Sequence, residues 1–419
     1  MQLVAISKAG RDRRDIVLGV SYLALAAFIV FILPRATTGL KSTFALTSYR
    51  GGVTIKAPDL VVPTASSLSA LGALVALAGA WQLARGFKRV NLVLVLVVGV
   101  GITAFLVWAT RAKSLNLTGM LVSSLVRATP IALAALSGIY SERSGVVNIG
   151  IEGMMLVGAF TSVVLASVSD SLLVGVLGGI LGGVILAVLH GVLSIRYKVD
   201  QVVSGTGIII LALGLTSYLQ RAVLNLYPEL NQPGPAIRAL PIPVLWKTPV
   251  IGPLLFNQSP VIYTLFVLLA VTHVLLYNTR WGLRVRAVGE HPRAADTLGI
   301  NVFKTRYVSV LISGAIAGLS GAYMSIGAAG RFNEGMTAGK GFLGLAAMIF
   351  GNWNPAGAFL GALIFGFFDS WQEKLAILQV GIPIDLLGMA PYLATMIVLA
   401  GVVGRARAPA ADGQPYEKQ

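Results

Sequence analysis

Runs of about 20 apolar residues recur along this chain, and they restrict it to one class of fold. Each run can cross a hydrocarbon layer as a helix, because a helix satisfies its backbone hydrogen bonds internally. A β-barrel would instead alternate polar and apolar residues over short segments. Hydrophobic residues make up 56% of the sequence and charged residues only 11%, whereas soluble domains have roughly 25% charged residues. The sequence therefore predicts an all-α polytopic membrane protein.

The apolar runs form about ten to twelve hydrophobic segments, and most of them are long enough for a complete crossing. They cover residues 16–33, 64–84, 90–110, 117–139, 154–168, 172–195, 199–219, 260–278, 306–328, 336–351, 355–371 and 386–404. The shorter segments at 336–351 and 355–371 are candidates for discontinuous half-helices.

Basic residues beside the apolar runs predict the orientation in the membrane. Lys8, Arg11, Arg13 and Arg14 precede the first run, which is longer than the apolar core of a cleaved signal peptide. We therefore expect a retained first span that starts in the cytoplasm and, by parity, a cytoplasmic C-terminus. The loop at 221–259 contains seven prolines, which exclude a continuous helix, and we expect it to lie over the outer face.

Two polar interruptions indicate where a substrate pathway lies. The first runs from Ser141 to Gly153, and the second comprises Gly339-Lys340-Gly341 and the turn Asn352-Trp353-Asn354. Paired breaks are typical of discontinuous helices around a pathway, since backbone groups there can face water or substrate. Asn148 and Glu152 are four residues apart and would share a helix face.

We therefore assign the candidate substrate pathway to Asn148, Glu152, Asn352 and Trp353. Carboxylates within a membrane are costly unless they have a function, which favours Glu152. The alternative is that Glu152 caps a helix or pairs locally.

Glycines spaced four residues apart predict close contacts between helices. The pairs are Gly178 with Gly182, Gly179 with Gly183, Gly314 with Gly318, and Gly357 with Gly361. Small residues at this spacing let two backbones approach within a membrane, and this structural role is favoured over a role in substrate binding.

The stretch from Thr279 to Arg306 carries dense charge between two long apolar runs. Its charged residues are Arg280, Arg284, Arg286, Glu290, Arg293, Asp296, Lys304 and Arg306. Pro292 stands where a short helix could begin. A short helix between two spans has a surface free to meet a partner, although the stretch could also be a solvated loop.

The sequence lacks the residue patterns of disulfides, metal sites, phosphate-binding loops, enzymes and nucleic-acid-binding proteins. There is no cysteine, and the three histidines are widely separated, so we expect neither a disulfide nor a metal site. The stretch from Gly335 to Gly341 departs from a phosphate-binding loop, because its glycines are too close together and no Ser or Thr follows Lys340. No constellation of nucleophile and base indicates an enzyme. The net charge of +16 is spread over short loops, which argues against nucleic-acid binding.

Two groups of motifs carry a resemblance to a known family. One is Ala128-Thr-Pro-Ile-Ala-Leu-Ala-Ala-Leu followed by Ser141-Glu-Arg-Ser-Gly-Val-Val-Asn-Ile-Gly-Ile-Glu-Gly-Met-Met. The other is Trp281-Gly-Leu-Arg-Val-Arg-Ala-Val-Gly-Glu with Ala294-Ala295-Asp-Thr-Leu-Gly-Ile. The chain resembles the permease subunits of bacterial ABC importers, in the branched-chain amino acid and simple-sugar permease family, and the nucleoside-importer subgroup is nearest.

The resemblance covers about 115–404, the permease core. Residues 1–114 form an N-terminal extension with three expected spans, and residues 405–419 form a polar cytoplasmic tail. A multi-pass protein of the bacterial plasma membrane is implied.

The resemblance also implies partners and a mechanism. The expected partners are a cytoplasmic ATPase, a second homologous permease and an extracytoplasmic substrate-binding lipoprotein. The chain itself needs no cofactor, since the ATPase would use the ATP and Mg²⁺. The coupling helix of the family maps onto about 289–299, and the ATPase-coupling residues are Arg284, Arg286, Gly289, Glu290, Arg293, Ala294, Ala295, Asp296 and Gly299.

The expected activity is the import of a small polar solute, with nucleosides favoured by subgroup and simple sugars behind them. A different alternative is a secondary transporter driven by an ion gradient. Such a transporter needs charged residues within its spans, and Arg127, Glu152 and Asp369 are the few candidates.

Overall fold

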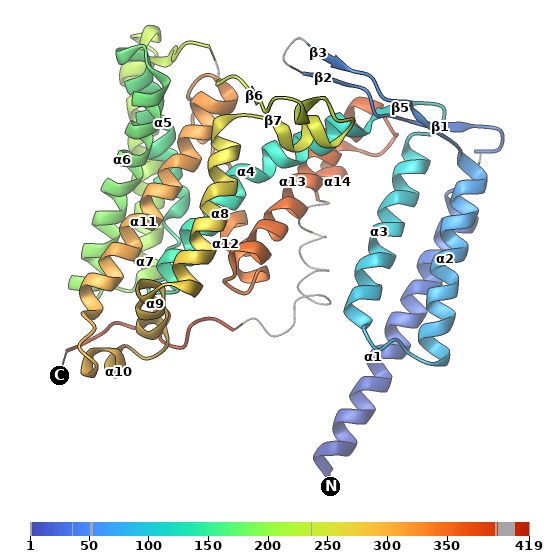
Figure 1. Ribbon diagram of the computed structural model, residues 1–419, viewed down its shortest axis with the longest axis horizontal. Coiled ribbons are helices and arrows are strands. Elements are labelled where there is room, and N and C mark those ends of the chain that lie inside the picture. The colour runs from blue at the N-terminus through green and yellow to red at the C-terminus, as the bar shows by residue number, and fades with distance from the viewer. Residues whose placement is uncertain are drawn as a thin grey trace. The chain divides into compact units, whose positions relative to one another are not determined.

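Helices dominate the computed structural model, in which residues 2–35, 37–50, 53–235, 237–389, 392 and 407–418 are described (Figure 1). The chain divides into two compact units. The first comprises residues 1–120, 247–250 and 371–404, and the second comprises residues 121–246, 251–370 and 405–419. Within the described residues, nine helices are long and apolar enough to cross a membrane.

The first unit contains three long helices and a small sheet. The helices are α1 (Gln2–Ala27), continued by a π-helical turn at Phe28–Ile32, α2 (Thr64–Ala84) and α3 (Val90–Ala109). Glycines bring α1 against α2: a Cβ on Gly72 would lie 2.3 Å from Cγ2 of Val30, and one on Gly79 would lie 3.1 Å from the backbone nitrogen of Leu23. Small residues thus set the helix spacing here as well.

Four short strands lie between α1 and α2, and the pattern of apolar runs did not predict them. In one sheet β1 (Lys41–Ala45) lies between β4 (Leu60–Pro63), which is antiparallel to it, and β5 (Ser114–Asn116), which is parallel. The strands β2 (Ser48–Arg50) and β3 (Val53–Ile55) pair with each other in antiparallel orientation.

The second unit is built around α5, α6 and α11. Its long helices are α5 (Ile151–Ser169), α6 (Leu172–Gly191), α7 (Gln201–Leu219), α8 (Pro260–Asn278) and α11 (Val302–Ala322), together with α4 (Leu117–Glu142) from residue 121 onward and α13 (Pro355–Leu378) up to residue 370. Its shorter helices are α9 (Arg280–Glu290), α10 (Pro292–Thr297) and α12 (Lys340–Phe350). Turns of π-helix extend three of the long helices, at Val192–Arg196, Gln220–Leu224 and Tyr323–Ala329.

The predicted glycine pairs lie where helices of the second unit touch. A Cβ on Gly318 of α11 would lie 2.2 Å from the carbonyl oxygen of Gly179 in α6, and one on Gly183 would lie 2.2 Å from that of Gly314. Real Cβ atoms do not approach that closely, so these positions have no room for a side chain. Backbone contact between α6 and α11 therefore depends on glycine.

The loop between α7 and α8 is irregular, as its prolines predicted. It contains short 3₁₀ turns at Pro228–Asn231 and Leu245–Lys247, a π-helical turn at Gly252–Phe256, and the strand pair β6 (Leu240–Pro241) and β7 (Asn257–Gln258).

The discontinuous pair has unequal members. α12 has 11 residues and is too short to span a membrane, as expected for a half-helix. α13 has 24 residues and continues to Leu378, beyond the predicted end at 371. The last predicted run, 386–404, lies largely outside the described residues, which include only the end of the short helix α14 (Ile384–Gly388) and its neighbours.

Candidate functional site

The charged stretch between α8 and α11 folds into two short helices, α9 (Arg280–Glu290) and α10 (Pro292–Thr297). We call residues 280–299 the coupling segment, after the role that the resemblance predicts for it. Thr279 is the N-cap of α9, since its side-chain oxygen accepts a hydrogen bond from the amide of Gly282 at 3.1 Å. His291 interrupts the helix with a non-helical backbone conformation, and Pro292 occupies the first position of α10. Gly299 follows in the left-handed conformation, which terminates the segment. The predicted short helix beginning at Pro292 is confirmed.

One face of the coupling segment is buried and the other is exposed. Val285, Val288 and Gly289 of α9 and Ala295 of α10 are buried. The exposed residues are Arg280, Leu283, Arg284, Glu290, His291, Arg293, Ala294, Thr297, Leu298 and Gly299. Leu298 is 81% exposed. A large apolar side chain so accessible in a charged segment is suited to insertion into a partner.

Not all predicted coupling residues lie on the exposed face. Ala295 and Gly289 are buried, and Arg286 lies partly buried with its guanidinium carbon 5.2 Å from the ring centroid of Tyr277. Gly289 has no room for a side chain, because a Cβ there would lie 2.2 Å from the carbonyl oxygen of Arg143. These residues support the segment from beneath.

The first predicted break packs under the coupling segment and against the turn between α12 and α13. Glu142, at the end of α4, accepts a hydrogen bond from Nε1 of Trp353 at 2.7 Å. Arg143 donates to the carbonyl oxygens of Trp353 at 3.1 Å and Asn352 at 3.3 Å. Asn352 and Trp353 both adopt left-handed backbone. The structure therefore brings these two predicted pathway residues to the same end of the unit as the coupling segment.

Asn148 lies elsewhere, in a buried polar cluster between helices. Its amide nitrogen donates to Oγ of Ser313 in α11 at 3.0 Å, and Ser313 also bonds Oγ of Ser137 in α4 at 2.9 Å. Asn148 is fully buried, and its Oδ1 has no hydrogen-bond partner among the described residues.

Glu152 joins α5 to the beginning of α12. Its two carboxylate oxygens accept hydrogen bonds from the amides of Gly339 at 2.8 Å and Gly341 at 2.6 Å. The expectation that Asn148 and Glu152 share a helix face is wrong, because α5 begins only at Ile151 and Asn148 lies in the preceding non-helical turn. The two side chains contact different helices.

The C-terminal tail is the part of this surface that sequence reasoning missed. Residues 407–418 pack against the coupling segment: the amide of Ala411 donates to the carbonyl oxygen of Gly289 at 2.9 Å. The amide of Ala410 donates to Oε2 of Glu290 at 3.2 Å. Tyr416 is only 5% exposed. An aromatic residue in an otherwise polar tail was the available signal in the sequence.

Burial also changes the ionisation of the tail. Asp412 is largely shielded from water, which raises its pKa to about 7 from an ordinary value of 3.8. The amide of Gly413, a hydrogen bond with Glu142 and the charge of Arg306 each oppose that rise. Two carboxyl groups can share a hydrogen bond only if one of them carries a proton, so the Asp412–Glu142 contact itself requires a protonated member.

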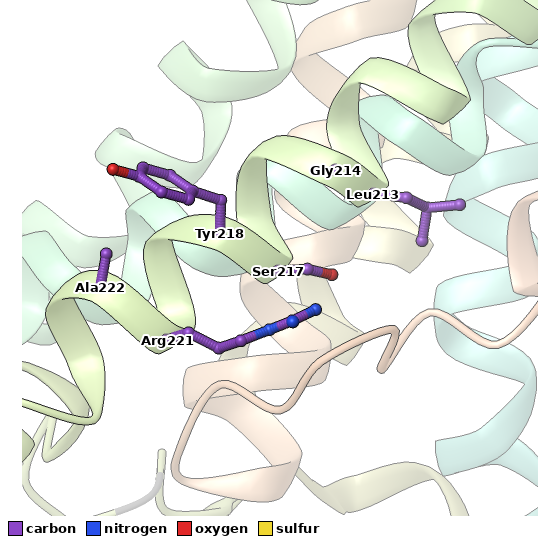
Figure 2. A pocket seen from close by; sticks show the side chains of 6 residues that line it. All are labelled: Leu213, Gly214, Ser217, Tyr218, Arg221 and Ala222. Atoms are coloured by element: carbon purple, nitrogen blue, oxygen red, sulfur yellow. The ribbon is translucent and has the colours of Figure 1, made fainter.

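A separate cavity of about 510 Å³ lies along α7 and the turn that follows it (Figure 2). Its lining residues are Leu213, Gly214, Ser217, Tyr218, Arg221 and Ala222. Arg221 forms an ion pair with Glu334 at 3.3 Å, and both side chains are well exposed. No pattern in the sequence singled out this cavity. Among the described residues, no group of three or more His, Cys, Asp or Glu side chains is arranged to hold a metal ion.

Comparisons with known proteins give a consistent result. Residues 120–404 match the family described as branched-chain amino acid transport system / permease component. The chain is 41% identical over 307 residues to the guanosine ABC transporter permease protein NupQ of Bacillus subtilis, covering 71% of this chain and 95% of that protein. It is 39% identical over 317 residues to the nucleoside ABC transporter permease protein NupC of Lactococcus lactis, covering 71% and 96%.

A third relative is a putative glucose ABC transporter permease of Haloferax volcanii, which is 32% identical over 329 residues and is covered over 98% of its length. In each of these three organisms a second permease protein is also similar to the chain. The identity is 28% for Bacillus subtilis, 23% for Lactococcus lactis and 26% for Haloferax volcanii. No solved structure matches the chain.

Proposed function

Because this chain belongs to the branched-chain amino acid transport system permease family, we propose that it is the membrane permease subunit of an ATP-driven importer that takes up nucleosides. The observation that carries the choice of substrate is the 41% and 39% identity to permeases named for guanosine and for nucleosides, each covered over nearly its whole length. The chain is a multi-pass membrane protein and not itself an enzyme.

The coupling segment is the proposed contact with a cytoplasmic ATPase. Its two helices are anchored by Val285, Val288 and Ala295, and Leu298 projects outward. An apolar side chain that fills a pocket on a partner, surrounded by charged residues, is a common centre of binding energy. ATP binding would then move α9 and α10 together with α8 and α11, which continue from them, and so switch the side to which the pathway opens.

The remaining partners are proposed to be a second permease and a substrate-binding lipoprotein on the outer side. Support for the second permease comes from the relatives, because each of three organisms has two permease proteins similar to this chain. We propose that the N- and C-termini are cytoplasmic, which places the coupling segment on the side of the ATPase.

The substrate pathway is proposed to include Asn148, Glu152, Asn352 and Trp353. Asn148 offers an unpartnered amide oxygen within a buried polar cluster, and a buried polar group without a partner has a free energy cost that a ligand or water would relieve. Glu152, Asn352 and Trp353 border the ends of the half-helix α12, so a movement of α12 would displace all three.

Uptake by the purified complex tests the function. Reconstituted with its copurifying ATPase and lipoprotein, the chain should import guanosine only when ATP is present on the ATPase side. Excess nucleoside should compete with this uptake, whereas excess glucose should not. Competition by glucose would favour a simple-sugar permease, which the Haloferax relative represents. Uptake driven by an ion gradient without the ATPase would identify a secondary transporter.

A substitution at Leu298 tests the docking surface. Burying a leucine side chain contributes roughly 1.5–3 kcal/mol, so Leu298→Asp should weaken ATPase copurification by at least tenfold. Val244→Asp is a matched control, because Val244 is also 81% exposed but lies in the loop between α7 and α8. Equal copurification of both variants would show that Leu298 is not part of the contact.

Reversing the charges of Arg286 and Glu290 should also weaken copurification of the ATPase, although Glu290 contacts the tail as well.

A further inference from the structure

The C-terminal segment 407–418 lies beyond the region that matches the family, which ends at residue 404. It nevertheless has an ordered place in the second unit. Pro409, Ala411 and Tyr416 are buried, while the residues between them are mostly exposed. A free polar tail would show no such alternation, so this segment is packed onto a specific surface.

The first contact joins the segment to the end of α9. Ala411 donates its amide hydrogen to the carbonyl oxygen of Gly289. Gly145 lies beside both: a Cβ there would be 3.1 Å from the carbonyl oxygen of Ala411 and 3.5 Å from Cα of Gly289. The tail, the coupling segment and the turn after α4 therefore meet backbone to backbone.

Tyr416 is the second and larger contact. It packs with Val288 of α9, Ala295 of α10 and Val302 at the start of α11. Its ring centroid lies 5.5 Å from that of Phe303, and its hydroxyl group faces the carboxylate of Asp296. One side chain thus contacts α9, α10 and α11.

The helix α10 depends on this contact for its position. It has six residues, and Ala295 is its buried residue. A six-residue helix is not stable in isolation, and it is bounded by the non-helical residue His291 and the left-handed Gly299. Tyr416 supplies part of the apolar surface that covers Ala295, together with Val288 and Val302.

Other residues of the segment attach it to distant parts of the unit. The backbone carbonyl oxygen of Gln414 accepts a hydrogen bond from Nη1 of the buried Arg306 in α11 at 3.0 Å. The amide of Arg407 donates to Oδ1 of Asn352, in the turn between α12 and α13, at 2.9 Å. Asp412 bonds Glu142 at the end of α4. The coupling segment is therefore connected through the tail to helices that do not adjoin it in sequence.

We propose that the segment 407–418 positions the coupling segment for the ATPase and transmits its movement to α4 and to the α12–α13 turn. Tyr416 is the main positioning residue. This inference rests on the proposed function, because it assumes that the coupling segment is where the ATPase acts. It adds a mechanical connection to two that the structure already provides. These are the continuation of α9 and α10 into α8 and α11, and the packing of Gly289 against Arg143 in the turn after α4.

The number of nucleosides transported per ATP hydrolysed, measured on the full complex in proteoliposomes, tests the proposal. In the Tyr416→Ala variant this ratio should fall at least fivefold, the lower end of typical coupling between sites, while the ATPase still copurifies. Tyr416→Phe keeps the ring against Phe303 and should retain most of the ratio. Lys418→Ala is the matched control, because Lys418 is exposed in the same segment.

An unchanged ratio in Tyr416→Ala, with normal copurification, would overturn the proposal. If that variant does not fold, Ala411→Pro removes the hydrogen bond to Gly289 without removing a buried side chain, and it should lower the ratio in the same way. Failure of the proposed function is distinguishable, since the unmodified complex would then show no ATP-dependent nucleoside uptake at all.

Discussion

At the scale of single residues, Glu152 is a buried carboxylate with a defined structural role, and we propose that it also takes part in transport. It lies in the first turn of α5 and is only 6% exposed, with both oxygens bonded to amides at the start of α12. Bonds between a charged group and backbone amides are short and strong. Glu152 therefore fixes where the half-helix begins.

Replacing Glu152 with Gln should impair transport more than assembly. The amide group of Gln offers one acceptor oxygen instead of two, so one glycine amide loses its partner. A hydrogen bond to a charged group contributes roughly 1.5–3 kcal/mol, and we expect the uptake rate to fall by about tenfold. Radiolabelled nucleoside uptake and ATPase copurification are the two measurements. Glu229→Gln, at an exposed site, is the control; normal uptake by Glu152→Gln would leave the residue with a structural role only.

The two residues of the first break also show a limit of sequence patterns. Spacing alone placed Asn148 and Glu152 on one helix face, but that inference needed a helix that begins before both. The helix begins at Ile151, because Gly145 takes the left-handed conformation and the turn after α4 continues to Gly150. Periodicity gives relative directions only once the boundaries of an element are known.

At the scale of elements, the contact between α6 and α11 depends on glycine in a way that can be measured. Gly318→Ala would place a methyl group 2.2 Å from the carbonyl oxygen of Gly179. Overpacking of this kind costs typically 1–3 kcal/mol, so the unfolding temperature in detergent should decrease. Gly207→Ala in α7 is the matched control, because nothing lies within 4 Å of a Cβ there. Equal unfolding temperatures for the two variants would contradict tight packing of α6 on α11.

The docking of the tail should depend on pH. The pKa of Asp412 is raised by burial to about 7, so the docked state holds this proton more tightly than the undocked state. Docking is then most stable below the ordinary pKa of 3.8, weakens as pH rises, and reaches its minimum above about pH 7. Glu142 of α4 and Arg306 of α11 are the ionisable groups that face Asp412.

A spin label can follow this docking, since the chain has no cysteine of its own. The label is attached at Pro415→Cys. The mobile fraction of the label should increase between pH 5.5 and 7.5, because the equilibrium constant for docking falls by up to about tenfold per pH unit. Asp412→Asn should remove most of that dependence. Identical spectra at both pH values would show that Asp412 does not control the docking.

At the scale of the whole molecule, the proposed orientation has a direct test. His291 lies in the coupling segment and Glu229 in the loop between α7 and α8, and both are exposed. In the cysteine-free chain, His291→Cys should react with a membrane-impermeant maleimide only in inside-out vesicles, and Glu229→Cys only in right-side-out vesicles. The opposite result would place the coupling segment outside the cell, where no cytoplasmic ATPase could reach it.

The amino-acid sequence by itself determined the membrane class, most of the spans, the short helix at Pro292 and the glycine contacts. All of these follow from local composition and spacing, because a chain in hydrocarbon must form helices long enough to cross it. The family was also readable from motifs of the core, such as Ser141 to Gly153.

Only the tertiary structure decided which distant segments share a surface. The strands between α1 and α2, the bond of Glu152 to α12 and the packing of Tyr416 over α9, α10 and α11 join residues far apart in sequence. Such contacts depend on where whole elements come to rest, which periodicity does not encode. The sequence predicts only a polar tail, and the packing of its aromatic residue Tyr416 depends on a surface that other elements form.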